Sequence, residues 1–307
     1  MTNAASHTIT DAAKDNATTA PTASRPTIPA EAAVNAPNSP AADDPYNALR
    51  ESQHNSPAAD ASERIWNLIV RGDLPELHAN EKIDTIQYYD SYIETYLRRD
   101  VRDLASVGDL AAFNRFMGLL AQTHGRQLNK TELATRTGVA VATIGRWLLV
   151  LEASGIIFML KPLLVNTGKR LTKSPKLYFC NSGLAARLCR ITTGKDLAQS
   201  PQAGEFFEGF VIAEIIKSHL NHTGTLPDVY YYRDSNRNEI DLVLANGSNL
   251  YPIEIKSSAA ARPSDASAFR HLDALSSYVR KPGAVICNCD RPLPLPDGDW
   301  TIPVNLL

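Results

Sequence analysis

Two β-prone runs joined by an Asn-Gly dipeptide constrain the fold of this chain more than any other feature of its sequence. Residues 239–244 and 251–257 alternate apolar and polar side chains with a period of two, which is typical of half-buried strands. Asn246-Gly247 between them favours a tight turn, because both residue types tolerate positive φ. The pattern predicts a β-hairpin, preceded by another β-prone run at 229–233 and a polar turn. After the hairpin we expect a helix over 266–278 and a last core strand over 284–286.

The period of two also sorts the hairpin side chains by face. The expected core face carries Ile240, Leu242 and Leu244 from the first strand and Tyr251, Ile253 and Ile255 from the second. Glu239 and Asp241 then occupy the other face of the first strand, as Glu254 and Lys256 do on the second. Because the two strands are neighbours, we expect Asp241, Glu254 and Lys256 on the same side of the sheet.

A fourth charged residue, Glu208, lies on a predicted helix over 205–217. At about 100° per residue, it falls within about 60° of Val211, Ile212 and Ile215, so a carboxylate interrupts an apolar stripe. Burying that carboxylate unpaired would be costly, so we expect it to meet a cation, a metal ion or a hydrogen-bond donor. The alternative is that the stem of Glu208 packs while its carboxylate reaches water.

These residue types fit metal-assisted chemistry on a phosphodiester. Carboxylates such as Asp241 and Glu254 are ligands for a hard divalent ion, Mg²⁺ in particular, and Glu208 is a third candidate. Such an ion polarises a phosphodiester and lowers the pKa of a bound water. Lys256 would stabilise the developing charge or orient that water. The sequence therefore predicts a catalytic and metal site of Asp241, Glu254, Glu208 and Lys256; the alternative is a set of ordinary solvent-facing charges.

Positive charge is concentrated in the middle of the chain. Residues 91–190 carry 15 basic and 6 acidic side chains, whereas the whole chain has a formal net charge of −2. A block with net charge +9 attracts polyanions at long range. The alternative is a solvated basic surface that faces an acidic neighbouring domain.

The basic block contains the pattern of a helix-turn-helix. Asn129 is a candidate helix cap with Glu132 as its reciprocal partner, and Gly138 permits a sharp turn before a second helix over 141–153. An apolar strand over 156–160 follows. The pattern predicts a winged helix-turn-helix domain over residues 111–190.

The winged helix suggests residues that contact nucleic acid. Thr143 and Arg146 lie near the start of the second helix, and the proposed wing carries Lys169, Arg170 and Lys173, followed by Lys176. Phosphate contacts from these side chains would give DNA binding, with little base-specific readout. The alternative is a winged helix that serves only for domain packing.

Composition limits the other classes of function. The first 60 residues hold 16 Ala and 7 Pro and almost no aromatic residues, so we expect a disordered tail over 1–60. The chain lacks the glycine-rich phosphate loop of Walker-type proteins, which predicts that it has no ATP site of its own. No stretch approaches the ~18 apolar residues of a membrane span, and neither a signal peptide nor a disulfide framework is evident. We therefore expect a cytoplasmic protein.

Several motifs together resemble a known family. They are Gly72–Glu76, Tyr92–Val101, Phe207–Val211, Tyr232-Arg233, Glu239–Asp241 and Pro252–Ser257. In this combination, residues from about 62 to 290 resemble the C-terminal half of prokaryotic AAA-type ATPases that carry a domain of unknown function of the DUF4143 type. Asp241, Glu254 and Lys256 match the motif of the PD-(D/E)xK nuclease core, and Glu208 matches its helix-borne acid.

The resemblance implies an α/β (α+β) fold in which a winged helix precedes a restriction-endonuclease-like domain. The expected organisation is a tail over 1–60, a helical remnant of an ATPase domain over 61–110, the winged helix over 111–190 and the nuclease-like domain over 191–307. Family members begin with an ATPase domain, and here a tail stands in its place. The chain is then expected to be a truncated relative or to work with an ATPase in trans.

Two hypotheses of function follow. The first is a DNA-binding, Mg²⁺-dependent nuclease in which the winged helix delivers DNA to Asp241, Glu254 and Lys256. The second is a non-catalytic binding or regulatory module related to, or partnered with, an ATPase.

Overall fold

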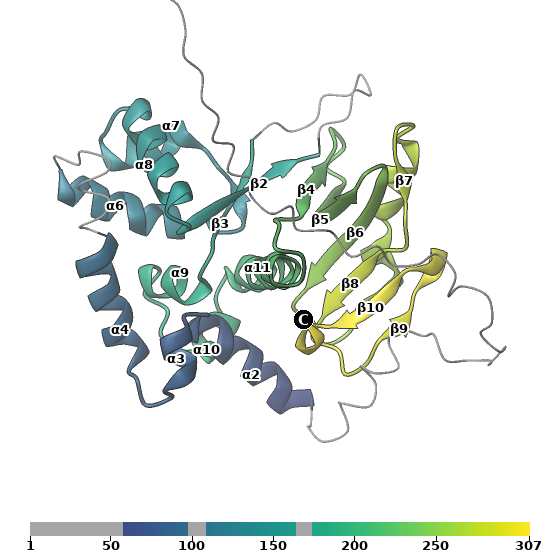
Figure 1. Cartoon of the computed structure of the whole chain (residues 1–307), viewed down its shortest axis with the longest axis horizontal. Coiled ribbons are helices and arrows are strands. Elements are labelled where there is room, and N and C mark those ends of the chain that lie inside the picture. The colour runs from purple at the N-terminus through teal and green to yellow at the C-terminus, as the bar shows by residue number, and fades with distance from the viewer. Residues whose placement is uncertain (1–57, 98–108, 164–173) are drawn as a thin grey trace, which may run out of the picture. The chain divides into compact units, whose positions relative to one another are not determined.

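The computed structural model of the chain describes residues 58–97, 109–163 and 174–307, all of which belong to one compact unit (Figure 1). The predicted α/β class is confirmed, because helices and short helical turns pack on a mixed sheet. The predicted tail lies outside the described residues up to residue 57, and residues 58–60 are helical. Lys169, Arg170 and Lys173 also lie outside them. No helix in the described part of the chain is long and apolar enough to cross a membrane.

Four short helical segments form the first described part of the chain. They are α2 (Ala58–Arg71), α3 (Pro75–Ala79), α4 (Thr85–Tyr92) and the π-helix η1 (Ile93–Leu97). Helix α4 begins at Thr85. The reason is the side chain of Asp84, which accepts hydrogen bonds from the backbone N–H groups of Ile86 and Gln87 and caps the helix there.

Three helices and three strands follow. They are α6 (Leu110–Ala121), β1 (Arg126–Gln127), α7 (Lys130–Thr137), α8 (Val141–Ala153), β2 (Ile157–Pro162) and β3 (Lys176–Phe179). Asn129 caps α7 by accepting a hydrogen bond from the N–H of Glu132 at 3.1 Å, and Gly138 ends it with φ of 76°. The side chain of Glu132 pairs with Arg136 instead of completing a capping box. β3 lies antiparallel between β1 and β2.

A single mixed sheet of the described strands connects two parts of the chain, which we call the first half (α2 to β3) and the second half (residues 182–307). The remaining strands are β4 (Asp228–Arg233), β5 (Glu239–Asn246), β6 (Asn249–Lys256), β7 (Val279–Arg280), β8 (Ala284–Cys287), β9 (Leu293–Pro294) and β10 (Trp300–Pro303). β2 pairs in parallel with β4, after which β4, β5 and β6 are antiparallel and β8 and β10 run parallel to β6. The predicted hairpin turn is confirmed, with Gly247 at φ of 59°.

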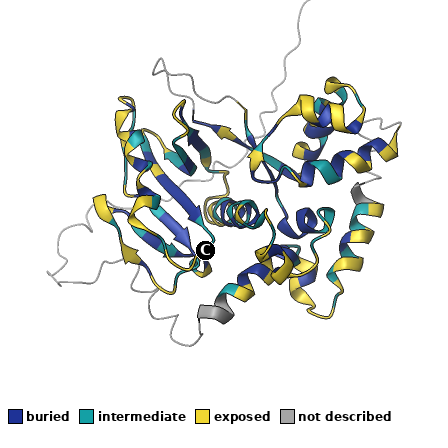
Figure 2. Ribbon diagram, turned by 180° about the vertical axis from the view of Figure 1, so that it is seen from behind, coloured by how far each residue is buried: buried dark blue, intermediate teal, exposed yellow. Residues whose placement is uncertain are grey.

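Helix α11 (Ala203–Thr223) lies against one face of this sheet, between the sheet and the other helices (Figure 1). It follows α9 (Ser182–Leu188) and α10 (Gly194–Ala198). Phe206 and Phe207 are buried, and the ring of Phe207 lies 5.7 Å from that of Trp66 on α2. Figure 2 shows buried positions along α11 and the central strands. One hydrophobic cluster therefore contains residues from α2 through to the end of the chain.

The opposite face of the sheet is covered by two 3₁₀ helices, η2 (Pro263–Ala266) and η3 (Phe269–Ala274), where an α-helix over 266–278 was expected. The buried residues are Ala266, Phe269, Leu272 and Leu275. They recur at intervals of three, which is the period of a 3₁₀ helix and differs from the 3.6 residues of an α-helical turn. Short 3₁₀ helices, η4 (Pro296–Gly298) and η5 (Val304–Leu306), flank β10.

A β-bulge in β5 corrects the predicted alternation. Tyr230 pairs with Val243 and Tyr232 pairs with Ile240, so two residues of β5, Asp241 and Leu242, lie opposite one residue of β4. Ile240 and Leu242 therefore lie on opposite faces of the sheet, although the alternation predicted one face for both. Ile240 packs in the hydrophobic cluster beneath the 3₁₀ helices η2 and η3, whereas Leu242 packs in the cluster that contains α11. A bulge directs neighbouring side chains to one face, which turns Asp241 toward α11.

Candidate functional site

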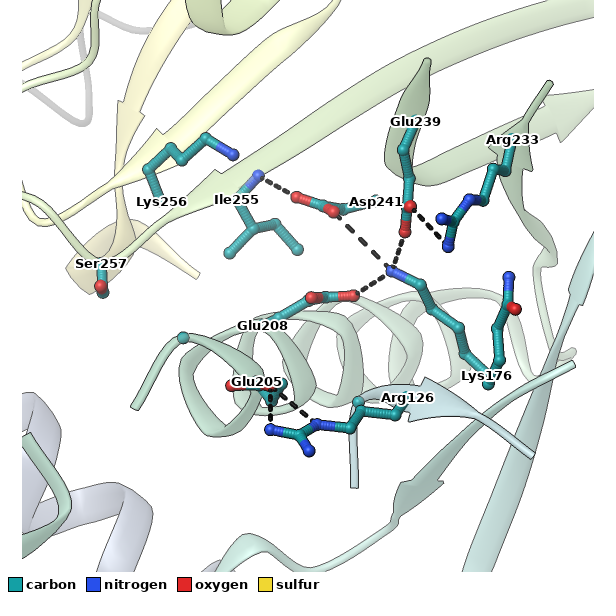
Figure 3. A pocket seen from close by; sticks show the side chains of 13 residues that line it. Arg126, Lys176, Glu205, Glu208, Arg233, Glu239, Asp241, Ile255, Lys256 and Ser257 are labelled. Carbon is teal, nitrogen blue, oxygen red and sulfur yellow. Dashed lines mark hydrogen bonds and ion pairs between the residues drawn. The ribbon is translucent and has the colours of Figure 1, made fainter. Parts of the chain in front are cut away.

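A cavity of about 490 Å³ collects the charged residues of both halves of the chain (Figure 3). Its walls come from β1, β3, the start of α11 and the strands β4, β5 and β6. The lining residues are Gly125, Arg126, Gln127, Lys176, Gly204, Glu205, Glu208, Arg233, Glu239, Asp241, Ile255, Lys256 and Ser257. Of the four predicted catalytic residues, the cavity brings together Glu208, Asp241 and Lys256, whereas Glu254 is not part of its lining.

Lys176 lies at the centre of the acidic side chains. Its Nζ is 2.6 Å from Oε1 of Glu239, 2.9 Å from Oε1 of Glu208 and 3.8 Å from Oδ1 of Asp241. It also lies 5.6 Å from the centre of the Tyr231 ring, a cation–π distance. Burial lowers and the three carboxylates raise the pKa of Lys176, with a net rise, so its ammonium group stays charged.

Glu208 finds the partners that its place in an apolar stripe requires. Oε1 accepts a hydrogen bond from Nζ of Lys176 at 2.9 Å and another from the hydroxyl of Tyr178 at 2.5 Å. Burial and the neighbouring charge of Asp241 raise the pKa of Glu208 to about 7, although Lys176 opposes this shift. Glu208 is therefore only partly ionised near neutral pH.

Asp241 is fixed by the backbone of the next strand. Its Oδ2 accepts a hydrogen bond from the N–H of Ile255 at 2.9 Å, and its Oδ1 faces Lys176 (Figure 3). Burial raises the pKa of Asp241, while Lys176 and Lys256 favour its ionised form. The bulge in β5 gives Asp241 this position beside α11, where strict alternation would have turned it away.

Glu254 and Lys256 form a pair of their own, with Nζ of Lys256 2.6 Å from Oε1 of Glu254. The alternation of β6 directs Glu254 away from Ile253 and Ile255, which pack in the cluster with α11. Glu254 is 8% exposed, and its Oε2 has no hydrogen-bond partner. Burial and the charge of Asp241 raise its pKa to about 8. The bulge thus turns Asp241 toward α11, so it no longer shares a face with Glu254 as the sequence pattern predicted, although its charge still acts on Glu254.

Two arginines complete the wall of the cavity. Nε and Nη2 of Arg126, on β1, donate to Oε1 of Glu205 at 2.9 and 2.7 Å. Nη1 of Arg233, on β4, lies 3.3 Å from Oε2 of Glu239. Each acidic residue of the lining is therefore paired with a cation of this chain.

In this arrangement the acidic side chains of the lining converge on a lysine and do not form an open site for a metal ion. Among the described residues, no group of three His, Cys, Asp or Glu side chains is placed to hold one. The carboxylates of Glu208, Glu239 and Asp241 do converge, but on the ammonium group of Lys176. Glu254, a predicted ligand, is not part of the lining and is paired with Lys256, which is.

Two family models match the sequence. Residues 203–307 match a domain of unknown function, DUF4143. Residues 62–195 match a second domain of unknown function, DUF8612. The resemblance to DUF4143 is confirmed for the part of the chain that carries α11, the hairpin and the last strands. The winged helix, the nuclease core and the ATPase context stay predictions.

The chain also resembles two mycobacterial proteins. Uncharacterized protein Rv2008c of Mycobacterium tuberculosis and uncharacterized protein Mb2031c of Mycobacterium bovis are each 32% identical to it over 197 residues. The match covers 64% of this chain and 43% of either relative. The chain therefore matches less than half the length of these relatives.

The predicted nucleic-acid contacts on α8 lie apart from the cavity lining. Arg146 is exposed and its Nη2 is 3.4 Å from Oγ1 of Thr143, which is half-buried. The exposed side of α8 also carries Val141 and Leu149, which are 45% and 66% exposed. Only one charged side chain, Arg146, lies near the start of α8, so a role in phosphate contact rests on that residue.

The site contains five charged residues that sequence reasoning did not assign to it: Arg126, Lys176, Glu205, Arg233 and Glu239. Glu239 had a usable signal, because it shares the predicted polar face of its strand with Asp241. Arg233 ends the preceding β-prone run and pairs with Glu239 across the strands. Lys176 was assigned to the wing because it follows the other basic residues of that segment. Nothing in its local sequence indicates that it contacts acidic residues of α11 and β5.

Proposed function

We propose that this chain binds nucleic acid at the cavity and does not hydrolyse it in the described arrangement. The phosphodiester backbone is the ligand class that a set of lysine and arginine side chains recognises without reading bases. The proposed function is therefore DNA binding by a nuclease-like domain without cleavage. The distribution of charge within the cavity supports it.

The observation that carries the proposal is that three of the four cations that line the cavity are more exposed than any of its carboxylates, whereas the fourth, Lys176, is buried. The side chains of Arg126, Lys256 and Arg233 are 52%, 39% and 32% exposed. Glu208 and Asp241 are each 13% exposed and both lie within ion-pair distance of Lys176. Glu205 and Glu239 are 25% and 29% exposed, and each is paired with an arginine. An approaching anion would therefore meet Arg126 and Lys256 first, while Glu208 and Asp241 stay paired deeper in the cavity.

The arrangement of elements supports a nuclease-like interpretation of the second half. A helix, α11, precedes three antiparallel strands, and the next two strands, β7 and β8, both run parallel to β6. In the first half, α6, α7 and α8 with the β1–β3–β2 order are typical of a winged helix. Both folds also serve proteins that bind without cutting, so the fold does not decide the chemistry of the site.

Retention of labelled duplex and single-stranded DNA tests the proposal. We expect salt-sensitive binding by the wild-type chain that weakens by at least about tenfold in the double variant Arg126→Ala with Arg233→Ala. Arg270→Ala is the matched control, because Arg270 is exposed and does not line the cavity. Arg146→Ala measures the separate contribution of α8.

The outcomes separate the parts of the proposal. Absence of salt-sensitive retention by the wild-type chain would contradict nucleic-acid binding. Equal loss in the Arg270→Ala control would show a general charge effect instead of a site at the cavity. Unchanged retention in Arg146→Ala would exclude the predicted role of α8 while leaving the cavity intact.

The second candidate is a Mg²⁺-dependent nuclease, favoured by the crowding of the acidic groups. Glu208 and Glu254 both have raised pKa values, and Oε2 of Glu254 is buried without a partner. A bound ion would supply Lewis-acid chemistry on a phosphodiester. Cleavage of plasmid DNA with Mg²⁺ or Mn²⁺ that disappears in Asp241→Ala and Lys256→Ala would establish this candidate and overturn the non-catalytic one.

A further inference from the structure

The ammonium group of Lys176 occupies a point on which three carboxylates converge. Oxygen atoms of Glu239, Glu208 and Asp241 lie 2.6, 2.9 and 3.8 Å from Nζ. They come from the second half of the chain, from α11 and β5, whereas Lys176 comes from β3 in the first half. A cation from one matched segment thus offsets part of the charge of the acidic cluster of the other.

The surroundings hold Lys176 in this position. It is 5% exposed, and its Nζ lies over the ring of Tyr231. The hydroxyl of Tyr231 donates to the carbonyl oxygen of Ser174 at 2.5 Å and accepts from Nε2 of Gln127 at 3.4 Å. Lys176 therefore enters the cluster between fixed neighbours, and it is not a surface side chain that swings freely.

We propose that Lys176 is a built-in counter-ion that excludes divalent ions from this cluster. Removing its charge would convert Glu208, Glu239 and Asp241 into a divalent-cation site. This ligand set contains Glu239 in place of the predicted Glu254. The inference deepens the proposed function, because it names the residue that keeps the site free of metal, but it does not require nucleic-acid binding.

Charge and distance support this exchange. Several buried carboxylates without a cation repel one another. Loss of the lysine charge therefore favours the binding of another cation at the same position. Hard divalent ions prefer carboxylate oxygens, and Ca²⁺ accepts flexible geometry at about 2.3–2.6 Å, whereas Mg²⁺ demands about 2.0–2.1 Å. Oxygen atoms already 2.6 and 2.9 Å from one point need smaller shifts for Ca²⁺ than for Mg²⁺.

The test measures binding of Mn²⁺ and Ca²⁺ to the full chain without nucleic acid. Lys176→Met removes the charge and keeps most of the side-chain length, and Lys176→Arg keeps the charge. Lys161→Met is the matched control, because Lys161 is an exposed lysine on β2 outside the cavity lining. Titration calorimetry with either ion and electron paramagnetic resonance of Mn²⁺ report binding directly.

We expect Lys176→Met to bind one ion per chain at least about tenfold more tightly than the wild-type chain, Lys176→Arg and Lys161→Met. Adding Glu239→Gln to Lys176→Met should remove that binding. Equal ion binding by wild type and Lys176→Met, or none by either, would overturn the proposal. A merely structural lysine would lower the melting temperature without creating an ion site.

A second readout covers the case in which Lys176→Met folds poorly. Lys176→Gln retains a polar group, and its melting temperature is measured with and without Ca²⁺ or Mn²⁺. We expect the ion to raise the melting temperature of this variant and to leave that of Lys161→Met unchanged. No ion-dependent rise would contradict the proposal. Failure of DNA retention would leave these ion measurements unaffected.

Discussion

His124 is a fully buried histidine whose surroundings favour the neutral ring. Its Nδ1 accepts a hydrogen bond from the N–H of Phe179 at 3.1 Å, while Nε2 has no partner. The ring lies 4.8 Å from that of Phe206, and a Cβ added at Gly209 would come within 2.2 Å of Nε2. Burial lowers the pKa of His124 to about 3. Gly209 is thus required by the space that this ring occupies.

The lowered pKa predicts a loss of stability in acid. An unfolded histidine takes up a proton near pH 6.5, whereas the folded one does so near pH 3, so the stabilising contribution is complete above about pH 6.5 and is lost as the pH falls toward 3. At about pH 5 the loss amounts to about 2 kcal/mol. Urea unfolding of the wild type and His124→Asn, compared at neutral pH and about pH 5, measures it. An equal fall in both proteins would contradict the assignment to His124.

Glu254 predicts a pH dependence of the opposite sign. Its pKa rises from 4.5 to about 8, so the folded chain favours the protonated form, and the stabilising contribution present below 4.5 is lost as the pH rises through 8. Glu254→Gln stays neutral and should therefore exceed the wild type in stability by a few kcal/mol above about pH 8. Urea unfolding at acid and alkaline pH checks this, with Glu152→Gln on the surface of α8 as control. A difference that does not grow with pH would refute it.

At the scale of elements, the 3₁₀ helices offer a test of periodicity. Leu272 and Leu275 are 0% and 4% exposed and lie three residues apart, whereas Arg270 and Ser276 are exposed. We expect Leu272→Ala and Leu275→Ala each to destabilise the chain by about 2–4 kcal/mol, because each removes buried apolar volume. Arg270→Ala and Ser276→Ala should change stability by less than about 0.5 kcal/mol. Urea unfolding measures all four, and a costly Ser276→Ala would indicate an α-helical period instead.

The same elements show where sequence patterns suffice and where they do not. The turn at Asn246-Gly247 and the cap at Asn129 could be predicted, because their physical cause lies within a few residues. The bulge in β5 could not be predicted, because the extra residue at Asp241 is defined by its pairing with β4. The interval of three over residues 266–275 was present in the sequence, and an assumed α-helical period concealed it.

At the scale of the whole chain, the candidate site depends on contacts between distant segments. Glu208 could be predicted from its place in an apolar stripe, and Asp241 could be named as a candidate from the local pattern, although its face depends on the bulge. Arg126 and Lys176 could not, because their partners lie about 80 and 30–65 residues further along the chain. Their positions follow from the sheet, in which β2 joins β3 to β4 and brings the two matched segments together.

This joining of the two halves predicts that they unfold together. Trp147 lies in the helices of the first half, where its ring is 5.3 Å from that of Phe113, and Trp300 lies on β10 in the second. Two variants test this, one that retains only Trp147 and one that retains only Trp300, with the other tryptophans replaced by phenylalanine. Because one hydrophobic cluster contains residues of both halves, the two variants should give superimposable urea transitions by fluorescence. Phe207→Ala should shift both transitions equally, by about 3–5 kcal/mol, since Phe207 is buried on α11 against α2. Two separate transitions, or a shift seen only by Trp300, would show that the second half folds as an independent domain and that the cavity lies at a separable interface.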